Sequence, residues 1–245
     1  MMQDLSEIFL SVKKAIKEQI ESRSFLYNSS SVREWLANIK ATDQDVLKQE
    51  ILDEVSVGDH EFSHEKWLYI QILLWRMADF DKKFVSQMAQ SFLFDPEIKN
   101  KEPWVSMLQD LDELATIASF FIRNPEYGDK YFQERQLLIL SETNLSLGDK
   151  ILYFLDSSEE ILCLAALIVM ESQKLKEYTP QIIDLFKRSE DTDIIKESAG
   201  IISKWQNDTG QLIANKITDL QKCNEEYYAE TIEELQETID RRKDD

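Results

Sequence analysis

Residues 154–169 read FLDSSEEILCLAALIV, a stretch in which a short acidic and polar turn leads into an almost wholly apolar segment. Residues 187–202, KRSEDTDIIKESAGII, repeat this arrangement at an offset of 33 residues. The aligned positions under this offset are Ile161 with Ile194, Leu162 with Ile195, Ala166 with Ala199, and Ile168 with Ile201. Polar turns that recur ahead of apolar segments at a constant period predict stacked helical units.

Glycine and proline are scarce in the rest of the chain. The 245 residues include 5 Gly and 4 Pro, whereas the two together make up about 12% of an average protein. Sandwiches, barrels and doubly wound sheets need these residues in their frequent turns, so most β architectures are excluded. With 43% hydrophobic residues the chain can bury a core, and the composition predicts an all-α protein. No linker-like stretch interrupts it, so residues 1–245 are expected to form a single domain.

Helix start signals and apolar spacing predict about twelve antiparallel helices joined by short connections. The first runs from about Leu5 to Ile20, and the next two begin near Ser31 and Thr42. Residues 67–80 are apolar on nearly every side, which predicts a central buried helix.

Proline positions and the last segment complete this map. Pro103 fits the first turn of a helix running toward Phe121. Thr179 followed by Pro180 predicts another helix start, with the threonine as the cap. Residues 209–241 contain no proline, and their only glycine is near the start, so one long C-terminal helix is expected.

The pattern of helix, acidic turn and second helix with a central small residue resembles a HEAT-type repeat over about residues 150–205. The resemblance implies a right-handed solenoid with an extended concave surface, and protein binding as its usual work. Ala166 and Ala199 are the expected close-contact positions between helices, and Gly200 is expected at a further close contact. An irregular helical bundle containing two similar hairpins is the alternative fold.

The chain is strongly acidic, with 47 acids, 28 bases and a formal net charge of −19. Such a charge repels nucleic-acid backbones and anionic membranes, so neither is an expected direct partner, and a HEAT-like nucleic-acid repair enzyme is disfavoured. Cys163 and Cys223 form no CxxC pair, which excludes a disulfide framework and a Cys-based zinc site. The start lacks a signal-peptide pattern and no apolar run approaches about 18 residues, so cytoplasmic residence is expected. The oligomeric state is left open.

The only two histidines lie in His60-Glu61-Phe62-Ser63-His64, which fits the H-E-x-x-H pattern of zinc metalloproteases. On an established helix His60 and His64 would bind zinc, and Glu61 would act as general base. A third ligand would be a carboxylate, with Asp79, Asp81, Glu97 and Glu102 as candidates. A helix break ahead of the motif and its charged flanks favour instead a polar helix start capped by Asp59 or Ser63. A zinc-dependent hydrolase is therefore the alternative hypothesis, and the leading one needs no cofactor.

The end of the chain is expected to present an acidic face, because residues 225–245 contain nine acids and three bases. The candidate partner-binding residues are Glu225, Glu226, Tyr227, Tyr228, Glu230, Glu233, Glu234 and Glu237. A basic protein would dock on these carboxylates with the tyrosines as anchors, although a solvated helix with its tyrosines packed inward is the plainer interpretation. The leading hypothesis is a non-enzymatic protein–protein interaction module that binds a basic protein, in its most concrete form an inhibitor or immunity-type protein.

Overall fold

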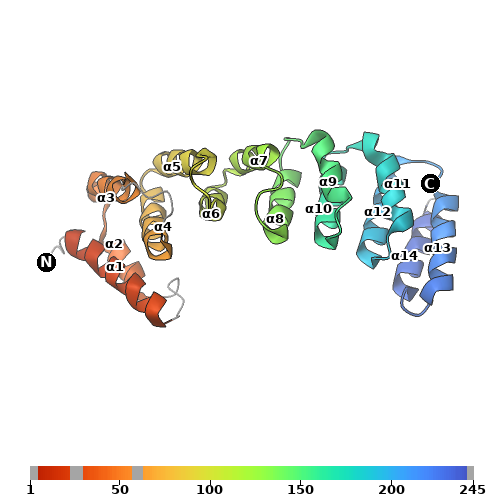
Figure 1. Ribbon diagram of the computed structural model, residues 1–245, viewed down its shortest axis with the longest axis horizontal. Coiled ribbons are helices and arrows are strands. Elements are labelled where there is room, and N and C mark those ends of the chain that lie inside the picture. Colours follow the sequence, from red (N-terminus) through yellow and green to blue (C-terminus); the bar gives the residue numbers. More distant parts are fainter. Residues whose placement is uncertain (1–4, 23–29, 57–62, 242–245) are drawn as a thin grey trace. The chain divides into compact units, whose positions relative to one another are not determined.

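A computed structural model describes residues 5–22, 30–56 and 63–241 of the chain (Figure 1). Within these ranges it contains fourteen α-helices, three short 3-10 turns and no strand. The predicted all-α class is confirmed, with somewhat more helices than expected. Among the described helices, none combines the length and the apolar character needed to cross a membrane.

The contacts of the chain form two compact units, Met1–Glu113 and Leu114–Asp245. The two units are considered one at a time below. That residues 1–245 make a single domain stays a prediction.

The unit boundary coincides with a break between α6, Glu102–Asp110, and α7, Leu114–Arg123. Asp112 in this break has a φ of 63°, a left-handed conformation that cannot continue a right-handed helix. The prediction of one helix from Pro103 toward Phe121 is therefore wrong, because the chain forms two helices there. Pro103 does lie in the first turn of α6, as predicted.

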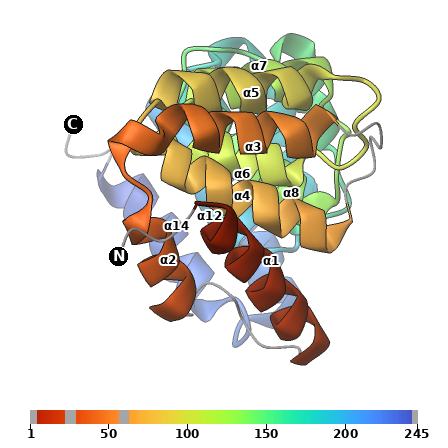
Figure 2. The ribbon, with the colours of Figure 1, turned by 90° about the vertical axis from the view of Figure 1, so that its left-hand side faces the viewer.

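The helices of the N-terminal unit, over its described residues, are α1 Leu5–Ser22, α2 Ser30–Asn38, α3 Gln44–Ser56, α4 His64–Ala78, α5 Lys82–Phe94 and α6. Helices α1, α3 and α5 pack against α4 (Figure 2). Residues 69–74 and Met77 of α4 are all buried, which confirms the predicted central helix. The Tyr69 hydroxyl donates to Glu50 Oε1 at 2.8 Å and thereby links α4 to α3.

The C-terminal unit contains α7, α8 Lys130–Ser141, α9 Ile151–Leu155, α10 Glu160–Ser172, α11 Thr179–Arg188, α12 Thr192–Trp205, α13 Gly210–Asn224 and α14 Ala229–Arg241. Consecutive helices pack as pairs: α7 with α8, α9 with α10, α11 with α12, and α13 with α14. We call α8, α10, α12 and α14 the second helices. They also pack on one another in that order (Figure 1), so the unit is a stack of four helix pairs.

The second helices run parallel to one another. Side-chain interactions join the N-terminal ends of neighbouring second helices, and others join their C-terminal ends. Lys130 at the start of α8 forms an ion pair of 2.6 Å with Glu159, the residue before α10. At the opposite ends, Gln173 follows α10 and donates to the backbone carbonyl of Leu140 in α8 at 3.2 Å. Ion pairs join the later helices in the same way: Lys204 with Glu171 at the ends of α12 and α10, and Lys196 with Glu230 near the starts of α12 and α14.

The second helices also share one burial pattern when they are aligned at their first residues. The seventh residues are all buried: Gln136, Ala166, Ser198 and Leu235. The first residues of α10 and α12, Glu160 and Thr192, lie 32 positions apart, so the repeat offset is 32 rather than the predicted 33. Accordingly Leu162, and not Ile161, corresponds to Ile194, and both are 4% exposed. Similar apolar residues at adjacent positions concealed this shift of one residue in the sequence.

The predicted long helix over 209–241 is wrong. Residues 225–228 form a turn, and α13 and α14 pack against each other on either side of it. The Asn224 side chain accepts a hydrogen bond from the backbone N–H of Tyr227 at 3.1 Å and so stabilises the turn. Folding back buries the apolar stripe of α13 against α14, which a single straight helix could not do.

The start of α11 is where the sequence predicts it, with Pro180 in the first turn. Thr179 does not act as the cap. Its hydroxyl donates to the backbone carbonyl of Lys176 at 2.6 Å and closes the short 3-10 turn over residues 176–178.

Candidate binding surface

The candidate partner-binding glutamates near the end of the chain lie on the turn after α13 and on the outer side of α14. Thr231 and Leu235 are buried on the inner side of α14, 2% and 1% exposed, and they orient the helix. The glutamates of the candidate set are all exposed: Glu225, Glu226, Glu230, Glu233, Glu234 and Glu237. The structure thus brings these carboxylates to one surface, as the sequence indicates.

Internal ion pairs neutralise part of this surface. Lys196 of α12 lies 3.2 Å from Glu230 and 3.0 Å from Glu234, and the hydrogen bond to Glu234 raises the pKa of Lys196. Glu237 pairs with Arg241 on its own helix at 2.7 Å. In the described part of the chain, Glu225, Glu226 and Glu233 have no cationic partner. These three carboxylates therefore carry the charge that a partner would meet.

The two tyrosines of the candidate set have different environments. Tyr227 is 66% exposed and packs edge-on against Tyr228, with ring centroids 4.7 Å apart. Tyr228 is 8% exposed, and its hydroxyl donates to the backbone carbonyl of Glu190 at 3.1 Å. Burial raises the pKa of Tyr228. Tyr228 thus links the turn before α14 to the loop before α12, and Tyr227 is the tyrosine accessible to a partner.

A second surface, which sequence reasoning missed, lies on the outer side of the second helices. We define the exposed face by the second, fifth and ninth residues of these helices. They are Tyr131, Glu134 and Leu138 in α8; Ile161, Leu164 and Ile168 in α10; Asp193, Lys196 and Gly200 in α12; and Glu230, Glu233 and Glu237 in α14. The signal in the sequence is weak, because Ile168 lies within an apolar run and is nevertheless 39% exposed.

Gly200 lies on this exposed face rather than at a contact between helices. A Cβ atom built on Gly200 would meet no atom within 4 Å outside its own helix. The predicted close contact is therefore wrong, because the side of α12 that carries Gly200 faces solvent. By contrast Ala166 and Ala199 are buried, 0% and 1% exposed, in the interior of the stack.

A cluster of two acids and one lysine adjoins the exposed face between α10 and α12. Lys204 forms an ion pair with Glu171. Partial burial, together with the charge of Glu171 and a hydrogen bond to it, raises the pKa of Glu197, and Lys204 opposes this effect. The Lys204 ammonium thus interacts with both neighbouring carboxyl groups, those of Glu171 and Glu197.

The H-E-x-x-H motif is only partly described. His60 and Glu61 lie outside the described residues. His64 is the first residue of α4 and is exposed, and the Ser63 side chain accepts a hydrogen bond from the backbone N–H of Lys66 at 3.2 Å. Ser63 is thus the helix cap, as one of the two capping predictions states.

The proposed carboxylate ligands have other surroundings. Asp81 caps α5 and accepts from the backbone N–H of Phe84 at 2.9 Å. Asp79 pairs with Arg76 at 2.9 Å, while Glu97 and Glu102 are exposed. The described ranges contain no group of three or more potential ligands arranged to hold a metal ion. Zinc binding through His60 and His64 stays an untested prediction.

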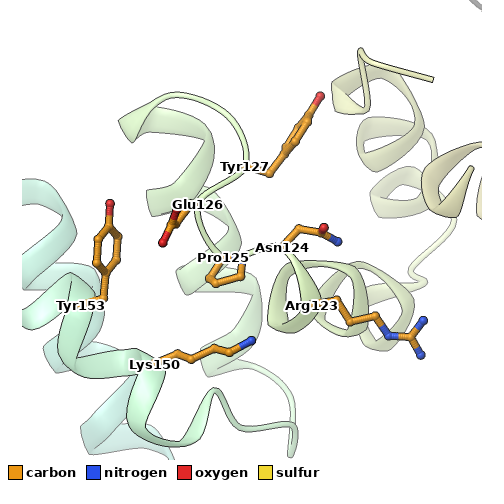
Figure 3. Close-up of a pocket in the computed structure, with 7 residues that line it drawn as sticks. All are labelled: Arg123, Asn124, Pro125, Glu126, Tyr127, Lys150 and Tyr153. Atoms are coloured by element: carbon orange, nitrogen blue, oxygen red, sulfur yellow. The ribbon is translucent and has the colours of Figure 1, made fainter. Parts of the chain in front are cut away.

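A hollow of about 510 Å³ lies in the C-terminal unit, between the connector after α7 and the start of α9 (Figure 3). Its lining residues are Arg123, Asn124, Pro125, Glu126, Tyr127, Lys150 and Tyr153. Arg123 and Tyr127 extend away from the side on which Lys150 and Tyr153 lie. The Lys150 ammonium donates to the backbone carbonyl of Ile122 at 2.9 Å. These side chains do not converge on one point. A catalytic site would require such convergence.

Comparison of the chain with protein-family models, with curated proteins and with solved structures finds no match.

Proposed function

We propose that this chain is a HEAT-like helical-repeat protein that binds a basic protein without catalysing a reaction. The stack of four helix pairs with a common register supports the repeat architecture. An extended stack of this kind offers a broad surface to a protein partner. An inhibitor or immunity-type protein, which occludes a cationic site on its target in the cytoplasm, is the concrete form that we propose.

The observation that carries this proposal is the set of exposed carboxylates of Glu225, Glu226 and Glu233, together with the exposed ring of Tyr227. These carboxylates have no cationic partner among the described residues, and the net charge of the chain is −19. A basic surface would gain favourable charge interactions there, and Tyr227 would add contact area with a hydrogen-bonding tip.

The test is affinity capture from the native host with the full chain immobilised, followed by mass spectrometry. We expect a basic protein to be retained at low salt and released as the salt concentration rises, because screening weakens the attraction. The triple variant Glu225→Gln, Glu226→Gln, Glu233→Gln should lose the captured protein. Its matched control is Glu18→Gln, Glu97→Gln, Glu177→Gln, which changes the net charge equally at three dispersed exposed positions.

Two results would contradict the proposal. One is capture that is insensitive to salt, and the other is equal retention by the triple variant and its control. Either result would show that the carboxylates near α14 do not attract the captured protein through their charge.

A further inference from the structure

The exposed face of the second helices is mainly apolar where α8 and α10 form it, and Glu134 is the acidic residue among its six defining positions there. Tyr131 is 64% exposed, Leu138 37% and Ile168 39%. Leu138 and Ile168 are the ninth residues of two parallel helices that pack together, so they lie side by side on one surface. Leu164, one turn before Ile168, is partly exposed on the same side. Tyr131, Leu138 and Ile168 thus each keep more than a third of their surface exposed.

The same face becomes acidic toward α14. Along the row of ninth residues, Leu138 and Ile168 are followed by Gly200 and then by Glu237. Glu233 and Glu230 lie on the same side of α14. Glu230 and Glu237 form ion pairs with Lys196 and Arg241, so Glu233 is the one of these three glutamates that has no cationic partner among the described residues. Lys196, the single cation at the defining positions of this face, is held by Glu230 and Glu234. An apolar half therefore adjoins an acidic half on one surface.

Gly200 lies between these two halves. A glycine inside a helix is less favourable than alanine by about 0.5 to 1 kcal/mol, and packing within the unit does not require one here. A Cβ atom at this position would meet open space, so internal crowding does not account for the glycine. A missing side chain does, however, allow another backbone to approach α12 closely.

We propose that this face binds an amphipathic, basic helical segment of another protein. The apolar side of that segment lies on Leu138 and Ile168, its backbone crosses α12 at Gly200, and its Lys or Arg residues reach α14, where Glu233 is the glutamate that needs a cation. The inference rests on the proposed function, since it specifies the chemistry of the basic partner. A helix seated in this way buries both halves of the face at once.

The carboxyl cluster beside the face supports this occupant. Partial burial and the neighbouring Glu171 raise the pKa of Glu197, and Lys204 is the cation that they share. An additional Lys or Arg from a partner would stabilise both charged carboxylates. A second copy of the chain suits the face less well, because each copy has a net charge of −19 and the copies repel.

The test uses the full chain and a fluorescent peptide of about 18 residues, roughly five helical turns, made of Leu and Lys. In one peptide the leucines form a single helical face, and in a second the same residues are rearranged so that no apolar face exists. Fluorescence anisotropy at low salt measures both affinities. We expect the amphipathic peptide to bind on the order of tenfold more tightly than the rearranged one.

Two variants locate the binding site. Gly200→Gln fills the open space with a good helix former, and Ile168→Ser removes an exposed apolar side chain. Each should weaken binding on the order of tenfold with helical content unchanged. Gly200→Gln should not reduce the urea midpoint, because Gln is a better helix former than Gly, whereas Ile168→Ser should reduce it modestly because Ile168 is 39% exposed and so partly buried. Gly210→Gln and Tyr153→Ser are the matched controls, because Gly210 also faces open space and Tyr153 is 55% exposed, on α9. The controls should bind as the wild type does.

Several outcomes would overturn the inference. Wild-type affinity in Gly200→Gln and Ile168→Ser would place the peptide elsewhere. Equal binding of both peptides, lost in the triple glutamate variant, would overturn this inference and leave the proposed function standing.

Sedimentation that shows a dimer abolished by Gly200→Gln would make a second copy of the chain the occupant and would overturn the inference. Failure of both peptides to bind would overturn the inference, and capture from the host would then decide the proposed function separately.

Discussion

The Lys216 ammonium in α13 donates to the backbone carbonyl of Lys187, 3.0 Å away at the C-terminal end of α11. It also donates to the carbonyl of Ser189 at 2.7 Å. The same relationship joins the other helix pairs of the unit: Lys150 donates to the carbonyl of Ile122 at the end of α7, and Arg188 to that of Leu155 at the end of α9. The C-terminal ends of α7, α9 and α11 thus each receive a cation from the next pair, which satisfies open carbonyls and complements the helix dipole.

Lys216→Met should destabilise the fold, because it leaves the carbonyls of Lys187 and Ser189 without their donor. Lys216 is 8% exposed, and burial lowers its pKa. We expect a loss of about 1.5 to 3 kcal/mol in the free energy of unfolding, measured by urea denaturation. Lys222→Met, on an exposed side of the same helix, should change it by less than about 0.5 kcal/mol. Equal effects of the two substitutions would show that Lys216 does not stabilise the end of α11.

Ser198→Ala should stabilise the protein. Ser198 is fully buried in α12, and its hydroxyl has no hydrogen-bond partner among the described residues. Ala166 occupies the equivalent buried position in α10, and alanine is smaller than serine by only the hydroxyl. Removing an unsatisfied buried hydroxyl and gaining helix propensity should add about 1 kcal/mol to the free energy of unfolding.

The control for Ser198 is Ser203→Ala on the same helix. The Ser203 hydroxyl donates to the backbone carbonyl of Gly200 at 2.9 Å, so its removal should bring no gain. A destabilised Ser198→Ala variant would reveal a partner for that hydroxyl, such as a buried water.

The sequence was sufficient for the helical class and for most helix starts, because both follow from local signals. Ser63 and Pro180 mark helix starts in the structure as their types predict. Helix ends were harder. The turn after Asn224 contains neither Gly nor Pro, and it forms because α13 and α14 bury each other's apolar sides. That gain is tertiary, so a pattern along the chain does not show it.

The candidate site was predictable only as a set of charges. Glutamates at exposed positions of α14 follow from composition, whereas the ion pairs of Lys196 depend on how α12 packs on α14. Tyr227 and Tyr228 are adjacent and identical in type, yet one is exposed and the other buried. Likewise Ile168 is indistinguishable from core residues in its apolar run, and only the neighbouring helices determine that it faces outward.

Glu197 should make the stability of the C-terminal unit fall as the pH rises above about 4.5. Partial burial and the neighbouring Glu171 raise the pKa of Glu197 from its ordinary value of 4.5. Between that value and the raised one, the folded state binds more protons than the unfolded state, so stability is lost as the pH increases through this window. Urea denaturation at a series of pH values measures the effect.

Glu197→Gln is the variant that isolates this effect. It should lose that part of the pH dependence and gain stability relative to the wild type as the pH rises through the window. Lys204→Met should raise the pKa of Glu197 further, because Lys204 is the cation that lowers it. A carboxyl titration by NMR that places the Glu197 pKa at or below 4.5 would contradict the prediction.

The last prediction separates helix capping from metal binding at the start of α4. Ser63→Ala should cost about 1 kcal/mol in the free energy of unfolding, because the backbone N–H of Lys66 loses its acceptor. His64→Ala should change it by less than about 0.5 kcal/mol, because His64 is exposed at the first position of the helix. Thermal melting with added zinc should leave the wild-type midpoint unchanged. Stoichiometric zinc in protein purified without chelator, together with a zinc-induced rise in midpoint that His64→Ala abolishes, would instead establish the metal site, because a ligand that binds only the folded state must stabilise it.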